Sequence, residues 1–207
     1  MAISFEDAAK GLVAIGRFLD ARGWAPATAG NYSVRFESER VAITASGFDK
    51  RALTVDDILV VDLDGTAVGE TALHPSAETP LHVQLYRDFD WARVVLHTHS
   101  IASTALGMAS PQPHEIALAD YELLKALRGF DTHATVAHIP IFENTQDMPA
   151  LAADVSRHLK DNPNAPGYLI RGHGLYIWAV DMTVARRQIE ALEFLFTCEL
   201  ERRRISR

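Results

Sequence analysis

The chain has 207 residues, of which 48% are hydrophobic and 23% are charged, and its formal net charge is −7 at pH 7. This composition is typical of a globular protein with a substantial core, and the acidic balance argues against nucleic-acid binding, which depends on basic residues that contact phosphates. Cys198 is the single cysteine, which excludes an intrachain disulfide and favours a reducing compartment.

The N-terminal segment predicts an amphipathic helix, because apolar residues recur in steps of three and four over residues 5–19. Ser4 precedes this run and can cap its first turn. Glu6 and Asp7 stand where a signal peptide would carry basic residues. No apolar run approaches the roughly 20 residues that cross a bilayer. We therefore expect a cytoplasmic protein without a membrane-spanning segment.

The rest of the chain alternates between predicted strands and predicted helices. Short apolar runs bounded by turn residues predict strands, and longer runs with helical spacing predict helices. The expected strands cover residues 32–36, 41–45, 58–63, 94–96, 135–139, 168–170 and 175–180, and the expected helices cover 77–89, 147–159 and 181–203. No Pro-, Gly- or Ser-rich linker and no internal repeat interrupts them. We therefore expect residues 1–207 to form a single α/β domain.

Three histidines stand at strand ends or turns and suggest a metal site. His97 and His99 end one predicted strand, two positions apart, so strand alternation points both imidazoles to the same face. His173 lies between Gly172 and Gly174, which allow a close approach of the backbone. Three histidine nitrogens with an open position form a catalytic zinc site. The alternative is a pair of strand-end histidines bonded to the backbone, because His-x-His alone is a weak motif.

Five segments resemble the class II aldolase and adducin family, in the order in which that family carries them. VLHTHS at 95–100 resembles its metal strand, and RGHGL at 171–175 resembles the turn with the last metal histidine. AGNYS at 29–33, ITASG at 43–47 and PSAE at 75–78 resemble its three substrate-phosphate loops. The resemblance covers about residues 5–200. It implies one Zn²⁺ per subunit, bound by His97, His99 and His173.

The resemblance also implies a fold and an assembly. The family has a central, mostly antiparallel sheet with helices on both faces, and it is usually a homotetramer with active sites near subunit interfaces. The last predicted helix carries one apolar stripe of Ile189, Leu192 and Phe196, and a second of Phe194, Leu195 and Cys198. A helix that is apolar on two sides must be covered on two sides, which favours an oligomer. Burial of both stripes within one chain is the alternative.

The substrate-binding residues that the resemblance implies are mostly small and polar. They are Gly30, Asn31, Ser46, Gly47, Ser76 and Glu78. Backbone N–H groups and hydroxyls of this kind cradle phosphates, although each residue alone is also an ordinary turn residue. Relatives often have Ser at Ala77 and Lys at His74, so the cation of the phosphate site changes here. Lys50 or Lys125 could replace it.

The segment after the metal pair bears on which reaction the site performs. DYELLK at 120–125 resembles the segment with the catalytic glutamate of the methylthioribulose-phosphate dehydratases, and so do GLYIW at 174–178 and LEFLF at 192–196. This resemblance makes Glu122 the expected catalytic acid/base. Glu78 stands where aldolases of the family have theirs. The alternative for Glu122 is a solvated acid at a helix start.

The resemblance therefore implies zinc-dependent dehydration of 5-methylthioribulose 1-phosphate to 2,3-diketo-5-methylthiopentyl 1-phosphate, a step of methionine salvage. Zinc would polarise the C2 carbonyl, and Glu122 would remove the C3 proton. One alternative is a fuculose- or ribulose-phosphate type aldolase or epimerase on the same metal site. Another is a non-catalytic domain, as in adducin, against which the three intact histidines argue. Manganese, iron or cobalt would also suit such ligands.

Overall fold

The computed structural model describes residues 3–110 and 115–206. In these residues eight strands form one sheet in the order β3-β2-β1-β4-β8-β7-β6-β5. The strands are β1 (Asn31–Arg35), β2 (Val41–Thr44), β3 (Ile58–Val61), β4 (Val94–Thr98), β5 (Glu115–Ala119), β6 (Val136–Phe142), β7 (Tyr168–Ile170) and β8 (Gly174–Ala179). All neighbours are antiparallel except β6 and β7. The predicted mostly antiparallel sheet is confirmed.

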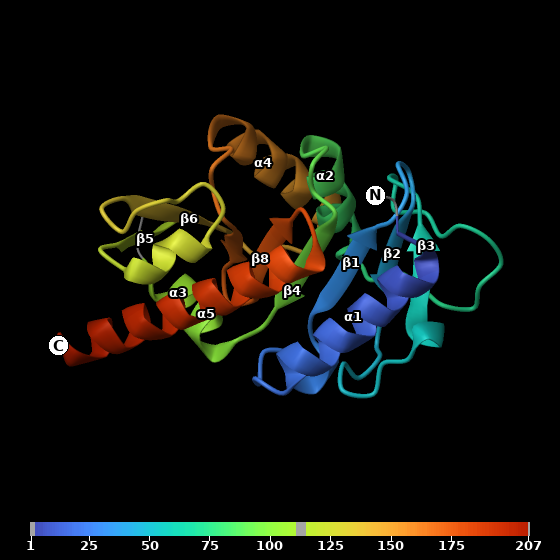
Figure 1. The fold of residues 1–207 in the computed structure, drawn as a ribbon, viewed down its shortest axis with the longest axis horizontal. Helices are drawn as coiled ribbons and strands as arrows, with labels where there is room; N and C mark the ends of the chain where they lie inside the picture. The colour runs from blue at the N-terminus through green and yellow to red at the C-terminus, as the bar shows by residue number, and fades with distance from the viewer. Residues whose placement is uncertain (1–2, 111–114, 207) are drawn as a thin grey trace.

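Helices cover both faces of the sheet, as predicted. They are α1 (Phe5–Asp20), α2 (Thr79–Asp88), α3 (Ile101–Ala109), α4 (Met148–Asp161) and α5 (Met182–Ile205), with short 3₁₀ turns η1 (Pro26–Thr28), η2 (Val55–Asp57) and η3 (Glu122–Ala126). Figure 1 shows α1 and α5 crossing the near side of the sheet. The residues of α1, α3 and α5 share one buried apolar cluster, and those of α2 and α4 share a second. No helix in the described ranges is both long and apolar enough to span a membrane.

The start of α1 follows the sequence pattern closely. The Ser4 hydroxyl accepts a hydrogen bond from the backbone N–H of Asp7 at 3.1 Å, which caps the first turn. Such a cap contributes about 1 kcal/mol. The predicted apolar face is buried, with Leu12 and Leu19 fully inaccessible to solvent. Burial of each leucine side chain contributes about 1.5–3 kcal/mol, so the packing of this face stabilises the helix more than its cap does.

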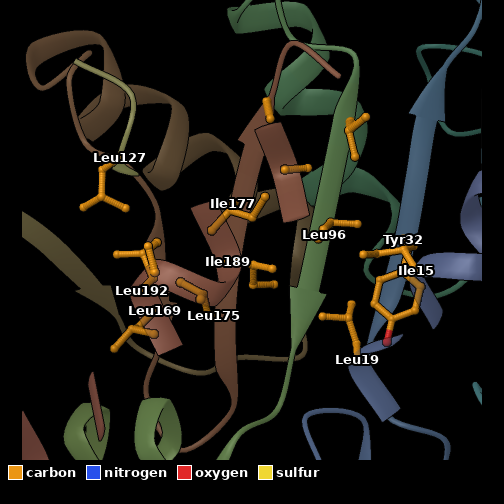
Figure 2. Packing of buried hydrophobic residues seen from close by; sticks show 14 of the residues in the cluster. Ile15, Leu19, Tyr32, Leu96, Leu127, Leu169, Leu175, Ile177, Ile189 and Leu192 are labelled. Carbon is orange, nitrogen blue, oxygen red and sulfur yellow. The ribbon is translucent and has the colours of Figure 1, made fainter. Parts of the chain in front are cut away.

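The register of the sheet places the candidate site. Along β4, alternation turns Leu96 toward α1 and α5, and turns Val95 and His97 toward α2 and α4. Figure 2 shows Leu96 in the first of these layers. Asn31 on β1 and Tyr176 on β8 are the direct partners of His97. Directly opposed residues share a face, so all three side chains project toward α2.

Each predicted strand and helix is present, with ends that differ by at most three residues, but α3 and β5 were not predicted. On α3 the large apolar residues Ile101 and Met108 are 82% and 62% exposed, so the helix has no apolar stripe that the sequence pattern would reveal. On β5 only Ile116 and Leu118 alternate inward. Both elements therefore lack the length of pattern on which sequence prediction depends.

The two apolar stripes that the sequence predicts on α5 have different surroundings. Ile189, Leu192 and Phe196 are fully buried, and Leu195 of the second stripe is also fully buried within the chain. Phe194 remains 56% exposed. In the second predicted stripe, Leu195 is therefore already covered by its own chain. Phe194 is the residue of that stripe that a partner subunit would have to cover.

Candidate metal centre and substrate cavity

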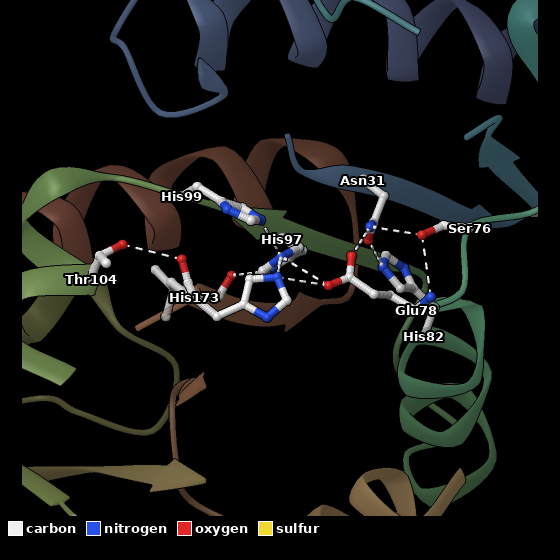
Figure 3. Close-up of polar contacts among 9 residues, drawn as sticks. Asn31, Ser76, Glu78, His82, His97, His99, Thr104 and His173 are labelled. Carbon is white, nitrogen blue, oxygen red and sulfur yellow. Dashed lines mark hydrogen bonds and ion pairs between the residues drawn. The ribbon is translucent and has the colours of Figure 1, made fainter. Parts of the chain in front are cut away.

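Three imidazoles meet at the end of β4. The Nε2 atom of His97 lies 2.8 Å from Nε2 of His99 and 3.3 Å from Nε2 of His173 (Figure 3). Nδ1 of His97 donates to the carbonyl oxygen of Leu175 at 3.0 Å, which fixes the tautomer and leaves the Nε2 lone pair free. Tyr176 stacks on the His97 ring at a centroid distance of 4.0 Å. The predicted grouping of the three histidines is present in the described residues.

The three nitrogens suit a zinc ion. Burial lowers the pKa of His97 well below its ordinary value, and burial followed by repulsion from His173 lowers the pKa of His99 to about 4. Neutral imidazoles whose lone pairs face one another are a ligand set. Zn–N bonds of about 2.0–2.1 Å at tetrahedral angles separate nitrogens by about 3.3 Å. The His97–His173 pair has this spacing, and the His97–His99 pair would widen by about 0.5 Å.

Two glycines allow neighbouring backbone to reach the metal strand. A Cβ on Gly174 would lie 1.9 Å from the carbonyl oxygen of Thr98, so no side chain fits there. Gly30 has a φ of +81°, and a Cβ would lie 2.7 Å from the carbonyl oxygen of His97. The glycine that follows His173 in the sequence is therefore needed for the approach of β8 to β4, as the sequence suggested.

Glu78 lies directly beside the three histidines. Its Oε1 atom is 2.8 Å from Nε2 of His173 and 3.7 Å from Nε2 of His97, and its Oε2 atom accepts from Nδ2 of Asn31 (Figure 3). Burial raises the pKa of the Glu78 carboxyl, but attraction to His97 and to the adjacent His173, together with the hydrogen bond from Asn31, holds it well below its usual range. Glu78 was predicted to line the substrate site. Its carboxylate also faces the metal ligands.

All the predicted substrate-binding residues border one cavity of about 290 Å³. Its lining consists of Thr28, Ala29, Gly30, Asn31, Ala45, Ser46, Gly47, Lys50, Ser76, Glu78, His99 and His173. Larger surface hollows of about 760 and 780 Å³ contain none of the three histidines. Of these three, the small cavity is the one at which histidines of the cluster, Lys50 and the small polar residues meet.

Lys50 is the cation of this cavity. Its side chain is 2% exposed, and Nζ donates to the carbonyl oxygens of Thr28 at 2.8 Å and Phe48 at 2.7 Å. Burial lowers the pKa of Lys50, although Asp49 and Glu78 attract its charge. Two acceptors leave one N–H donor of the ammonium available to a ligand. Of the two lysines that the sequence offered, Lys50 borders the cavity and Lys125 does not.

Glu122 is not part of the histidine cluster of its own chain. It begins η3, its side chain is 74% exposed, and its carboxylate pairs with Lys125 and, at 3.5 Å, with His133. The hydrogen bond from Lys125 lowers the pKa of Glu122. Glu122 does not border the cavity, and none of its described contacts involves a metal histidine.

Sequence reasoning missed a group of buried polar residues behind Glu78. His82 follows Glu78 by one helical turn and is fully buried, and it contacts Asn31 and Ser33. The spacing of four residues, which places two side chains on one helix face, was an available signal. A second missed residue is Glu193 on α5, which is 1% exposed and accepts from the hydroxyl of Thr98 between the two strand histidines.

Comparison with known proteins identifies the family of this chain and relatives over nearly its full length. A family model described as "Class II Aldolase and Adducin N-terminal domain" matches residues 10–200. Methylthioribulose-1-phosphate dehydratase of Marinobacter nauticus is 47% identical over 203 residues, which are 98% of this chain and 97% of that protein. The protein of the same name from Stenotrophomonas maltophilia is 54% identical over 190 residues, 91% of this chain and 88% of the relative.

Two solved structures that resemble this chain are L-fuculose 1-phosphate aldolases by name. An L-fuculose 1-phosphate aldolase superposes with a TM-score of 0.81 at 22% identity and covers all of this chain and 90% of its own. The L-fuculose-1-phosphate aldolase of Thermus thermophilus superposes with a TM-score of 0.75 at 26% identity, covering 96% of this chain and 95% of its own.

Proposed function

Because this chain belongs to the class II aldolase and adducin family, we propose that it is a hydro-lyase that dehydrates 5-methylthioribulose 1-phosphate to 2,3-diketo-5-methylthiopentyl 1-phosphate. The observation that carries the proposal is near-full-length identity of 47–54% to relatives named methylthioribulose-1-phosphate dehydratase, combined with the histidine cluster. The reaction belongs to methionine salvage, and we place it in the cytoplasm.

We propose that the cofactor is zinc, one ion per subunit. His97, His99 and His173 would hold it, because their three nitrogens converge and His97 is locked in the ligating tautomer. When bound, zinc would supply a Lewis acid for the substrate carbonyl, which makes the neighbouring C–H bond more acidic. The chain itself supplies the remaining functions, which are phosphate binding and proton transfer.

The substrate phosphate would bind at the end of the cavity that is lined by small residues. Gly30, Asn31, Ser46, Gly47 and Ser76 line it together with the buried ammonium of Lys50. A buried cation with a spare N–H donor attracts a phosphate more strongly than an exposed lysine would, because less solvent screens it. The phosphate would thus anchor the substrate with its carbonyl toward the histidines.

Glu122 is the proposed acid/base. Dehydration breaks the C3–H bond, whose electron pair forms the C3=C4 double bond while the C4–O bond breaks and water leaves. The resulting enol then tautomerises to the diketone. A carboxylate can take the C3 proton and return a proton to the departing hydroxyl. Since Glu122 is exposed and does not border the cavity of its own chain, we propose that it acts in the cavity of a neighbouring subunit of a homotetramer.

An aldolase or epimerase acting on a sugar phosphate is the second candidate. The ionised carboxylate of Glu78, 2.8 Å from His173, is in position for acid/base chemistry in the same chain. A solved structure of similar fold that is 26% identical is named L-fuculose-1-phosphate aldolase. These two observations keep bond cleavage as the competing reaction of this site.

Product identification by mass spectrometry separates the two candidates. The zinc-loaded protein is incubated with methylthioribulose 1-phosphate and, separately, with fuculose 1-phosphate. We expect a product 18 mass units lighter than methylthioribulose 1-phosphate, the mass of one water, and no cleavage of fuculose 1-phosphate. Cleavage fragments or epimers without dehydration would instead support the second candidate. The His173→Ala variant is the control for non-enzymatic loss of water.

A further inference from the structure

A chain of buried polar groups leads from α2 to the metal centre. The hydroxyl of Tyr86 lies 2.7 Å from the hydroxyl of Ser33, which lies 2.7 Å from Nδ1 of His82. Nε2 of His82 contacts Oδ1 of Asn31, and Nδ2 of Asn31 contacts Oε2 of Glu78. Figure 3 shows the part of this chain from His82 to Glu78. Tyr86, Ser33 and His82 are fully buried, so water does not compete for these bonds.

The direction of every hydrogen bond in this chain follows from the carboxylate at its end. Asn31 presents its Nδ2 group to Oε2 of Glu78, which accepts, and this orientation leaves Oδ1 as the acceptor that faces His82. His82 must then carry its proton on Nε2, which leaves Nδ1 as an acceptor for the Ser33 hydroxyl. That hydroxyl in turn accepts from Tyr86. Each group therefore donates toward Glu78.

We propose that His82 is a positioning residue for the metal centre. An asparagine amide can rotate by half a turn, and the rotated Asn31 would place Oδ1 against the Glu78 carboxylate, two acceptors that repel. The Nε2–H of His82 prevents this, because it bonds only to Oδ1. Asn31 then holds one oxygen of Glu78 and leaves the other, Oε1, directed at His97 and His173.

The sheet explains why Asn31 can transmit this effect. Asn31 is the register partner of His97, so its amide is fixed beside the metal strand by the β1–β4 pairing. Its Nδ2 also lies 3.4 Å from the Ser76 hydroxyl in the phosphate loop. A single orientation of the Asn31 amide therefore makes the contact with Glu78 beside the histidines and the contact with Ser76 in the phosphate loop. The inference rests on the proposed metal site, but it does not depend on which substrate is dehydrated or cleaved.

Two substitutions of His82 separate positioning from simple packing. A glutamine amide reaches about as far as Nε2 of histidine, whereas an asparagine amide reaches only about as far as Nδ1. His82→Gln should keep the donor to Asn31, and His82→Asn should lose it while it still contacts Ser33. Zinc affinity is measured on the full chain by competition with a chelator. We expect His82→Asn to lose about 10–100-fold in zinc affinity, and His82→Gln to stay close to the wild type.

A control variant at Gln84 and an NMR measurement on His82 test the proposal further. Gln84→Ala removes another buried polar side chain of α2 outside this hydrogen-bonded chain, and it should lower thermal stability without a change in zinc affinity. In the wild type, ¹⁵N NMR of the His82 ring should show the proton on Nε2. A proton on Nδ1, or equal zinc affinity of the folded Asn and Gln variants, would overturn the proposal. Failure of the dehydratase assay alone would leave both readouts intact.

Discussion

Two glutamates, of which the sequence predicted Glu122 as the catalytic residue and Glu78 as part of the substrate site, have very different surroundings. Glu78 is half-buried, accepts a hydrogen bond from Asn31, and lies 2.8 Å from Nε2 of His173 in the histidine cluster. Glu122 is 74% exposed, and only Lys125 and His133 contact its carboxylate in the described residues. The region around Glu78 is assembled by the register of β1, β4 and β8 within one chain. A role for Glu122 requires a surface that a single chain does not supply.

Among substitutions near Glu78, removal of a proposed metal ligand should have the largest effect on zinc binding and on turnover. We expect alanine at His97, His99 or His173 to abolish most zinc binding and nearly all turnover, because two nitrogens do not replace a three-nitrogen site. Metal content is measured per chain by mass spectrometry after gel filtration. The exposed His138, which pairs with Glu115, is the control, and its alanine variant should keep its zinc. Full zinc content in all three ligand variants would contradict the assignment.

Substitution of the two glutamates tests the comparison directly. Glu122→Gln should leave zinc bound and lower turnover by about 10²–10⁴-fold, because glutamine cannot accept the proton. Glu78→Gln should lower zinc affinity as well as turnover, since its carboxylate faces the metal histidines. Zinc content and kcat are measured for both variants. Near-normal turnover of Glu122→Gln together with an inactive Glu78→Gln would favour the aldolase mechanism.

Much of the histidine cluster could be predicted from the sequence because local rules determine its geometry. Strand alternation places His97 and His99 on one face, and the glycine after His173 allows the close approach of β8. The buried neighbours of Glu78 were not predictable in the same way. Ser33 and His82 are 49 residues apart in sequence, and only the packing of α2 on the sheet brings them together.

The limits of prediction were different at α3 and at Glu122. On α3 the apolar residues Ile101 and Met108 are exposed while Ala102 and Leu106 are buried, so apolar residues on both sides of the helix leave no clear stripe to detect. The segment around Glu122 was marked by resemblance alone. The sequence position of Glu122 does not determine which histidine cluster its carboxylate faces, because that depends on how copies of the chain assemble.

Mixing of two inactive variants tests whether Glu122 acts between subunits. His97→Ala and Glu122→Gln are unfolded together, refolded as an equal mixture and assayed. If Glu122 acts in a neighbouring cavity, about one quarter of the sites in random tetramers combine an intact cluster with an intact glutamate. We expect activity to return to about that fraction of the wild type. If each site used its own Glu122, every site would carry a defect and no activity would return. Light scattering on the same samples reports whether a tetramer forms.

The smallest expected effect is on the pH dependence of stability, and it comes from Glu193. Unlike Glu78 and Glu122, this glutamate is almost completely buried. It lies beneath the metal strand, accepts from the hydroxyls of Thr98 and Ser100, and has no described cationic partner. Burial raises the pKa of Glu193 from 4.5 to about 7, although the two hydroxyls oppose the rise. The folded state therefore holds this proton up to a higher pH than the unfolded state does.

The contribution of Glu193 to stability should consequently be greatest below the unfolded pKa of 4.5 and should fall as pH rises to about 7, with no further loss from this group above that pH. The full loss is about 3 kcal/mol at 1.36 kcal/mol per pKa unit. Glu193→Gln carries no charge at any pH, so it should remove this part of the decline. Urea unfolding of the wild type and the variant at pH 5 and pH 8 measures it. Equal declines in both proteins would mean that the Glu193 carboxyl ionises in the folded protein as readily as it does in the unfolded chain.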